Sequence, residues 1–339
     1  MPRGTSRRGV LRAAAASVGV AAGLFAGSDD AAARSITDVT VRRRGAANGW
    51  RAVDSPTSKP LYAVEAAADG AYACGDSGVL LRRGADGWAV LDGDGPRGKN
   101  KTLYGLGVTD DGGGVWSVGA SGTVGEYRVD AGTARDHSTP NGYASTLTAV
   151  DVVGAVGDER VYAASGSGEL LCGVRGDDGS LTWTVLDTGG ATTVNGVDFH
   201  TRDAGRVVTT AARVFETTDG GDSWTQVGIA DAQNSMNAVV SGPDRIYAGG
   251  GNGRVWRQDC TCRLWTPTKP AAKSFLALER DGRYLLGAGE SGYVYERTGE
   301  EAAWTNTVVG AGSDLHGCVI GSGGDPDVVV GNGGEIFER

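Results

Sequence analysis

Few side chains in this sequence could carry catalytic chemistry. Histidine occurs only as His137, His200 and His316, and neither the G-x-S-x-G turn nor the H-E-x-x-H helix is present. A serine hydrolase needs an acid, a histidine and a nucleophile together, and a glycosidase needs two carboxylates about 5–10 Å apart over a cleft. Which acids and histidines can meet depends on the elements that carry them.

A repeat of 39–47 residues runs through the chain. Seven segments open with an apolar residue and carry Ala or Gly two positions later, namely Ala63, Gly105, Ala149, Gly196, Ala238, Ala277 and Gly317. This period is typical of the four-stranded blades of a β-propeller. Because the first strands of all blades converge on the central axis, a side chain larger than a methyl group would crowd its neighbours. We therefore predict an all-β fold, a single seven-bladed propeller over residues 34–339.

The end of the last repeat predicts how the ring closes. This repeat stops at Arg339 after its third strand, whereas residues 49–56, GWRAVDSP, have the fourth-strand pattern and precede the first repeat. The N-terminal strand should therefore complete the last blade and leave no free radial edge. Two sandwiches would not give one period, and a solenoid needs capped ends rather than complementary ones. Residues 36–44 also resemble a strand, but the pattern does not place it.

The stretch TTDGGDSW, residues 217–224, lies between the third and fourth strands of the fourth repeat. Thr217, Asp219 and Ser223 are suited to hydrogen bonding within the turn, and Gly221 allows backbone angles that other residues resist. Trp224 can pack onto the neighbouring blade. Degenerate copies recur at the same place in most repeats, for example GADGW at 84–88. This distribution indicates a structural role rather than a catalytic one.

TTDGGDSW resembles the Asp-box of sialidases, and with the recurring Trp-ended turns the chain resembles propellers of the BNR/YVTN/WD-repeat superfamily. Among these it is similar to the photosystem II stability/assembly factor-like propellers. That resemblance implies an exported, seven-bladed, non-enzymatic protein that docks on membrane-protein partners. A sialidase would instead need three convergent arginines, a Tyr nucleophile with a Glu partner, and an Asp acid. One of seven Asp-boxes is complete here, and the second repeat has none.

The repeat register predicts the residues of the top face, where the second and third strands of each blade meet. The residue after each first apolar position should reach this face: Tyr62, Tyr104, Thr148, Asn195, Asn237, Leu276 and His316. Asp76 and Glu290 are the acids of the adjoining turns. With His316 they form the best candidate cluster for a small ligand or a glycan, the alternative being solvated turn residues. The turns are too short to wall a deep pocket of the kind enzymes use.

A second candidate surface is a rim of arginines at the ends of the third strands. Six blades carry one: Arg82, Arg128, Arg175, Arg257, Arg297 and Arg339. On an acidic protein, arginine forks suit the carboxylates of a docking partner. The alternative is that they pair with nearby turn acids such as Asp86, Asp177 and Asp259.

Charge and the N-terminus indicate the compartment. Lys and Arg total 32 against 41 Asp and Glu, and a net charge of −9 disfavours nucleic acid as a partner. SRRGVLR at 6–12 precedes an Ala/Gly-rich apolar run, which is the pattern of a twin-arginine-type signal peptide over residues 1–33. We expect a protein of the cell surface or the extracellular space. An uncleaved leader acting as an anchor is the alternative.

The five cysteines do not form a disulfide framework. Cys74, Cys172 and Cys318 lie in apolar strands and should be small buried side chains. Cys260 and Cys262 form a C-x-C in a polar turn, either as a local disulfide or as free thiols, and lack the further ligands of a zinc site.

The sequence therefore predicts a non-catalytic propeller that serves as a protein-interaction scaffold or assembly factor. We expect a monomer with a protein partner, and no cofactor or metal. A carbohydrate-binding or sialidase-like propeller is the alternative. A quinoprotein-type propeller would need cofactor-stacking tryptophans, whereas the tryptophans here already have structural positions.

Overall fold

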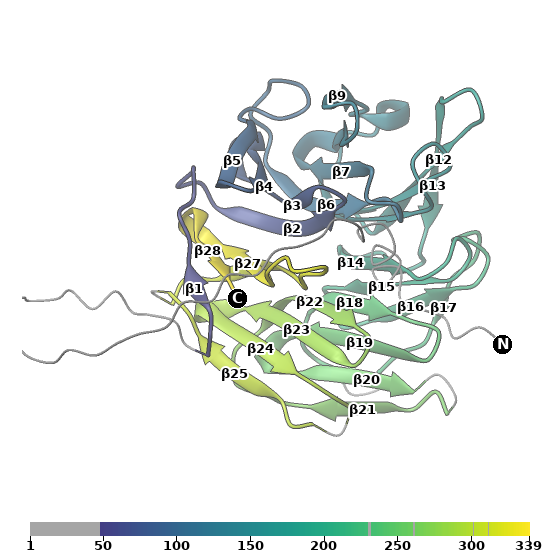
Figure 1. The fold of residues 1–339 in the computed structure, drawn as a ribbon. Helices are drawn as coiled ribbons and strands as arrows, with labels where there is room; N and C mark the ends of the chain where they lie inside the picture. The colour runs from purple at the N-terminus through teal and green to yellow at the C-terminus, as the bar shows by residue number, and fades with distance from the viewer. Residues whose placement is uncertain (1–47, 230–231, 260–261, 301, 311) are drawn as a thin grey trace, which may run out of the picture.

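The computed structural model describes residues 48–229, 232–259, 262–300, 302–310 and 312–339. The predicted leader at 1–33 and the strand-like stretch at 36–44 lie outside these ranges. Figure 1 shows sheets arranged around one centre, and there are seven of them, each with four antiparallel strands. This confirms the predicted seven-bladed propeller. In the part of the chain that is described, no helix has the length and apolar character needed to span a membrane.

The strands follow the chain from blade to blade, and the first strand of each blade is the innermost. Blades 1 to 3 contain β2 (Leu61–Ala67), β3 (Gly70–Gly75), β4 (Leu80–Gly84), β5 (Gly87–Asp92); β6 (Leu103–Val108), β7 (Gly114–Gly119), β8 (Thr123–Arg128), β9 (Thr133–Asp136); β10 (Leu147–Val153), β11 (Arg160–Ser165), β12 (Glu169–Arg175) and β13 (Leu181–Asp187). Blades 4 to 6 contain β14 (Val194–Phe199), β15 (Gly205–Thr209), β16 (Val214–Thr217), β17 (Thr225–Gln226); β18 (Met236–Ser241), β19 (Arg245–Gly250), β20 (Val255–Asp259), β21 (Trp265–Thr268); β22 (Phe275–Asp281), β23 (Tyr284–Gly289), β24 (Tyr293–Arg297) and β25 (Thr305–Val308).

Blade 7 joins the two ends of the described chain. It contains β26 (Leu315–Val319), β27 (Val328–Gly331), β28 (Ile336–Glu338) and, as its outermost strand, β1 (Arg51–Ala52). β1 lies beside β28 in Figure 1. The two strands run antiparallel, with Arg51 opposite Glu338. The predicted closure of the last blade by the N-terminal strand is therefore confirmed.

Small residues line the contacts between neighbouring innermost strands, as the repeat predicted. A Cβ atom on Gly105 would lie 3.1 Å from the Cα of Ala149 in the next blade. At the seam of the ring, a Cβ on Gly317 would lie 3.0 Å from the Cα of Ala63. The innermost strands thus approach one another at backbone distance, and larger side chains are excluded there.

The turn after each second strand is tied to the innermost strand of its own blade. In all seven blades, the first residue of this turn donates its N–H to the carbonyl that precedes the first strand, as in Asp76 to Pro60 and Glu290 to Ser274. Five of the turns are 3-10 turns: η2 (Asp76–Gly78), η3 (Ala120–Gly122), η5 (Gly251–Gly253), η6 (Glu290–Gly292) and η7 (Asn332–Gly334). A sixth such turn, η4 (Pro140–Gly142), precedes blade 3. The top face is therefore built from short turns that are fixed to the backbone.

In six of the seven blades, a tryptophan at or beside the outermost strand contacts the preceding blade, and blade 2 is the exception. Trp88 of blade 1 donates to Glu338 of blade 7 at 3.0 Å, and Trp265 of blade 5 donates to the Val227 carbonyl of blade 4 at 3.0 Å. The tryptophans at 50, 183, 224 and 304 enter apolar clusters that they share with the preceding blade. The aromatic side chain thus contributes most by burial between blades.

Glutamates of the third strands provide a second link between blades. Four of them occupy equivalent register positions and meet an arginine of the following blade: Glu126 with Arg175, Glu216 with Arg263, Glu296 with Arg339, and Glu338 with Arg83. The carboxylate oxygens lie 2.8 Å from Arg175, 3.0 Å from Arg263 and 2.8 Å from Arg83. We call these four pairs the inter-blade clasps.

Candidate functional site

The centre of the top face is formed by one bulged residue from each innermost strand. In all seven blades, the pairing of the first and second strands shifts register across the second residue of the first strand. The bulged residues are those that the repeat register placed on this face: Tyr62, Tyr104, Thr148, Asn195, Asn237, Leu276 and His316. The bulge itself had no sequence signal beyond the Ala or Gly that follows it.

Three of these residues form an aromatic arc across blades 7, 1 and 2. The ring of Tyr62 lies 5.4 Å from that of Tyr104 and 5.2 Å from that of His316, measured between centroids. Burial raises the pKa of Tyr62, and the nearby carboxylate of Asp76 raises it further. His316 is held from behind by Asn332, whose amide oxygen lies 2.9 Å from its Nε2. The arc is half-buried, so its faces are open in part to a ligand.

The opposite side of the centre is polar and occupied by its own hydrogen bonds. Asn195 donates to the Met236 carbonyl at 3.0 Å, and Asn237 donates to the Phe275 carbonyl at 2.8 Å. Thr148 donates to the Val194 carbonyl at 2.5 Å. Each of these side chains thus bridges to the innermost strand of the next blade and stabilises the ring.

The predicted cluster of Asp76, Glu290 and His316 is assembled only in part. Asp76 and His316 both lie beside Tyr62. Asp76 accepts a hydrogen bond from the Thr102 hydroxyl at 2.7 Å. Glu290 instead accepts from the backbone N–H of Ser274 at 3.1 Å, which directs its carboxylate toward its own blade. The aromatic arc, rather than the acids, is the prominent feature of this face.

The six arginines of the predicted rim differ in how they are bound. Arg175 is buried, and its guanidinium lies 2.7 Å from Glu159 and 2.8 Å from Glu126. Burial lowers the pKa of Arg175, but the hydrogen bonds and charges of these two carboxylates outweigh it and raise the pKa. Arg339 pairs with Asp327 at 2.8 Å and with Glu296. Acids of the chain therefore already pair with both arginines, although only Arg175 is buried.

The remaining rim arginines are less deeply held. Arg82 pairs with Asp69 at 2.7 Å, and Arg128 lies 3.6 Å from Asp130. The acids suggested by the sequence, Asp86, Asp177 and Asp259, are not the partners found within the described ranges. Local spacing missed the true partners because several lie on other strands or blades.

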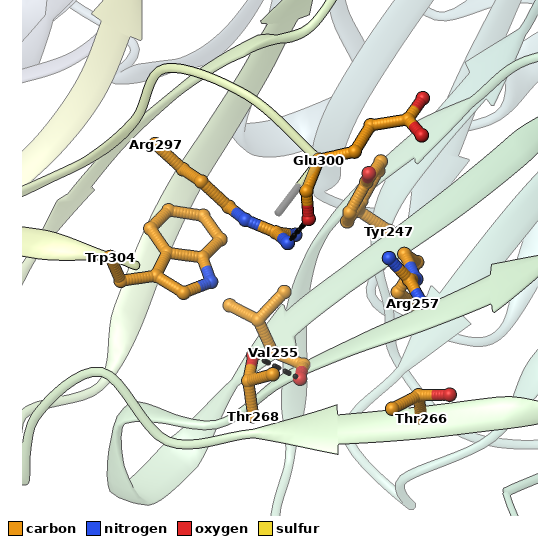
Figure 2. A pocket seen from close by; sticks show the side chains of 8 residues that line it. All are labelled: Tyr247, Val255, Arg257, Thr266, Thr268, Arg297, Glu300 and Trp304. Carbon is orange, nitrogen blue, oxygen red and sulfur yellow. Dashed lines mark hydrogen bonds between the residues drawn. The ribbon is translucent and has the colours of Figure 1, made fainter. Parts of the chain in front are cut away.

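Arg257 and Arg297 line a pocket of about 180 Å³ between blades 5 and 6 (Figure 2). The side chain of Arg257 makes no hydrogen bond or ion pair with the described part of the chain. Arg297 donates to the backbone carbonyls of Glu300 and Ala302, the latter at 3.0 Å. The other lining side chains are Tyr247, Val255, Thr266, Thr268, Glu300 and Trp304.

TTDGGDSW connects β16 to β17 and is closed by its own side chains. Asp219 accepts from the Ser223 N–H at 2.9 Å and from the hydroxyls of Ser223 and Thr217. These bonds, that of the Ser223 hydroxyl first, lower the pKa of Asp219 to about 2. Gly220 and Gly221 have φ of 76° and 100°, as a left-handed turn requires. Trp224 packs edge-on to Phe199, with ring centroids 6.1 Å apart.

The cysteines of the strands are buried, as predicted. Burial raises the pKa of Cys172 to about 11 and that of Cys74 beyond the usual range of thiols. Cys262 is exposed, and Cys260 lies outside the described residues. Among the residues that the structure describes, no three His, Cys, Asp or Glu side chains are grouped as metal ligands would be.

No protein-family model and no curated protein matches the chain. Solved structures are similar in fold. YCF48 bound to D1 peptide shares 15% identity over 86% of this chain and 95% of that chain, with a TM-score of 0.68. YCF48 from Cyanidioschyzon merolae shares 14% identity over 85% of this chain and 98% of that one, with a TM-score of 0.66. The WD40 repeats of RRP9 share 10% identity over 85% and 96% of the two chains, with a TM-score of 0.72. Together with the seven four-stranded sheets, these similarities identify the chain as a propeller whose structural neighbours are YCF48 and WD40-repeat proteins.

Proposed function

We propose that this chain is an exported, non-catalytic propeller that acts as a protein-interaction scaffold or assembly factor. The observation that carries the proposal is the state of the top-face acids. Asp76 is bound by Thr102, Glu290 by the N–H of Ser274, and Asp314 by the N–H of Ser291 at 2.8 Å. A carboxylate that already accepts bonds from its own backbone and turns serves as a structural acceptor rather than as a poised acid or base.

The similar structures support protein partners. One is YCF48 bound to a D1 peptide, and another belongs to the Mitotic Checkpoint Complex, with 12% identity and a TM-score of 0.70 over 94% of this chain. By analogy we assign this chain a protein partner, a membrane protein among the candidates, and a monomeric state. The arginine rim is the docking surface that suits such a partner. Export to the cell surface or beyond rests on the leader pattern of residues 1–33.

Affinity capture of the tagged protein from its own cells, read by mass spectrometry, tests this function. The comparison is the wild type against a variant with Arg82, Arg257 and Arg297 changed to Glu. A stoichiometric protein partner that the variant loses supports both the scaffold and the rim. Absence of any protein partner from the wild-type capture contradicts the scaffold function.

The aromatic arc favours a second candidate, a glycan-binding propeller. Tyr62, Tyr104 and His316 present ring faces on which a sugar can stack, and Asp76 lies beside them as an acceptor. Retention of the wild type on cell-surface glycan, lost when both tyrosines are changed to Ala, would support this candidate over the first.

A further inference from the structure

The pocket between blades 5 and 6 gathers positive charge that the chain itself does not neutralise. Arg257 stands on β20 between Tyr247 of β19 and Thr266 of β21, in one row across the blade. Its side chain has no hydrogen-bond or ion-pair partner in the described part of the chain, whereas the side chains of Arg82, Arg128, Arg175 and Arg339 all pair with acids. Arg297 binds only backbone carbonyls there, so its charge also lacks an opposing carboxylate.

The rest of the lining offers further donors and little negative charge. Thr266 is exposed on β21, and the indole nitrogen of Trp304 is buried with no hydrogen-bond partner among the residues that the structure describes. Figure 2 shows this nitrogen on the side of the ring that faces Val255. Glu300, the one acid of the lining, is already bonded to Arg245. A buried donor without an acceptor lowers stability. An acceptor that enters the pocket would approach the side of the pocket that carries the Trp304 Nε1.

We propose that this pocket receives a carboxylate of an acidic segment of a protein partner, with Arg257 as its principal ligand. This inference rests on the proposed scaffold function and names the chemistry of one docking point. A guanidinium fork pairs with a carboxylate through two parallel hydrogen bonds. The Arg257 side chain is half-buried, which screens its charge less than a fully exposed position would.

The size and charge of the pocket decide between occupants. Its volume of about 180 Å³ is below the roughly 300–1,000 Å³ that small-molecule sites occupy, so it fits one side chain or chain terminus of a larger partner. A phosphate group carries close to two negative charges, and the carboxylate of Glu300 in the pocket lining would repel it. A singly charged carboxylate suits Arg257 with less repulsion.

Fluorescence anisotropy with a labelled peptide of alternating Glu and Ser, measured on the full chain at low salt, tests the pocket directly. The variant is Arg257→Gln, which removes no hydrogen bond within the described chain and should fold as the wild type does. The matched control is Arg128→Gln, which removes the same charge from blade 2. We expect the Kd to rise at least tenfold in Arg257→Gln and to stay within twofold in Arg128→Gln. We also expect the peptide with Gln in place of Glu to bind weakly to every form.

Other outcomes overturn the inference. Equal weakening by the two variants, or equal binding of the Glu and Gln peptides, means that no specific carboxylate site exists here. Tighter binding of a phosphoserine peptide or of free glutarate rejects the assigned occupant. The cell capture separates this inference from the function on which it rests. A partner retained by Arg257→Gln leaves the scaffold standing and rejects the pocket, whereas a wild type that captures no partner rejects the scaffold.

Discussion

The indole N–H of Trp88 in blade 1 donates a hydrogen bond to the carboxylate of Glu338 in blade 7, across a sequence separation of 250 residues. Arg83 of blade 1 donates to the same carboxylate at 2.8 Å, and Arg51 of β1 lies 3.1 Å away. Burial alone would raise the pKa of Glu338, but the bonds from Arg83 and Trp88 outweigh it and lower the pKa. The seam of the ring therefore converges on one buried anion.

Replacing Glu338 by Ala should open this seam. Arg83 and Trp88 would then lose their hydrogen-bond acceptor. A hydrogen bond to a charged group typically contributes about 1.5–3 kcal/mol to stability. We expect the free energy of unfolding, measured with urea, to fall by about 2–3 kcal/mol. Asp54→Ala, an exposed acid of the same blade region, is the control and should change it little. Equal effects of the two substitutions would show that the seam does not depend on this anion.

The clasp at Glu126 predicts an acid-sensitive stability. Burial would raise the pKa of Glu126, yet the bonds from His137 and Arg175 hold it at about 2. A carboxylate with a depressed folded-state pKa stabilises the fold above its unfolded pKa, about 4.3, and this stability is lost as the pH falls toward 2. We expect a loss on the order of 3 kcal/mol across that window.

Urea unfolding of the wild type and of Glu126→Gln between pH 2 and pH 6 measures this dependence. The variant should be less stable at pH 6 and should show a shallower fall, because one linked proton is removed. Slopes that coincide for the two proteins would exclude Glu126 as a source of the acid sensitivity.

The sequence predicted the fold nearly completely because the repeat reports the backbone directly. Ala63, Gly105 and Gly317 mark contacts at which neighbouring innermost strands leave no room for larger side chains. The composite blade followed from a missing fourth strand at one end and a spare one at the other. Both signals are local, so one sequence is sufficient to see them.

The candidate sites were less predictable because they depend on contacts between blades. The partners of Arg175 are Glu126 and Glu159, one of them on another blade, and no local pattern indicates such a pair. The sequence could not show either that the Arg257 side chain lacks an acidic partner in the described chain, because its sequence neighbours resemble those of the paired arginines. The Glu that precedes the terminal Arg in EYR, YER and FER was a usable signal, and the repeat register would have aligned it.

Gly75, which ends β3, predicts a strict requirement for glycine. A Cβ at this position would lie 2.0 Å from the carbonyl oxygen of Pro60, which is backbone and cannot move aside cheaply. Gly75→Ala should therefore lower the free energy of unfolding by about 3 kcal/mol, as severe overpacking does. Gly84→Ala is the matched control in the same blade, because nothing lies within 4 Å of its added Cβ. Similar melting temperatures for the two variants would contradict the tight coupling of turn and innermost strand.

Trp224 provides the test of whether the TTDGGDSW turn is structural. Its half-buried ring joins a cluster with Phe199 and with Tyr162 of the preceding blade. Its Nε1 has no hydrogen-bond partner within the described ranges of the chain. Trp224→Ala should lower the free energy of unfolding by about 3 kcal/mol, and Trp224→Phe should recover much of it because packing alone is at stake.

Asp219→Asn should have a smaller effect on stability than Trp224→Ala, since Asp219 is exposed and Asn can still accept the Ser223 N–H. If the turn is purely structural, the folded forms of Trp224→Ala and Asp219→Asn should capture the same partner as the wild type. A variant that keeps the stability of the wild type but captures no partner would instead show that the turn takes part in binding. In that case a loss of packing could not explain the loss of the partner. The capture experiment and the unfolding curve must therefore be measured on the same preparations.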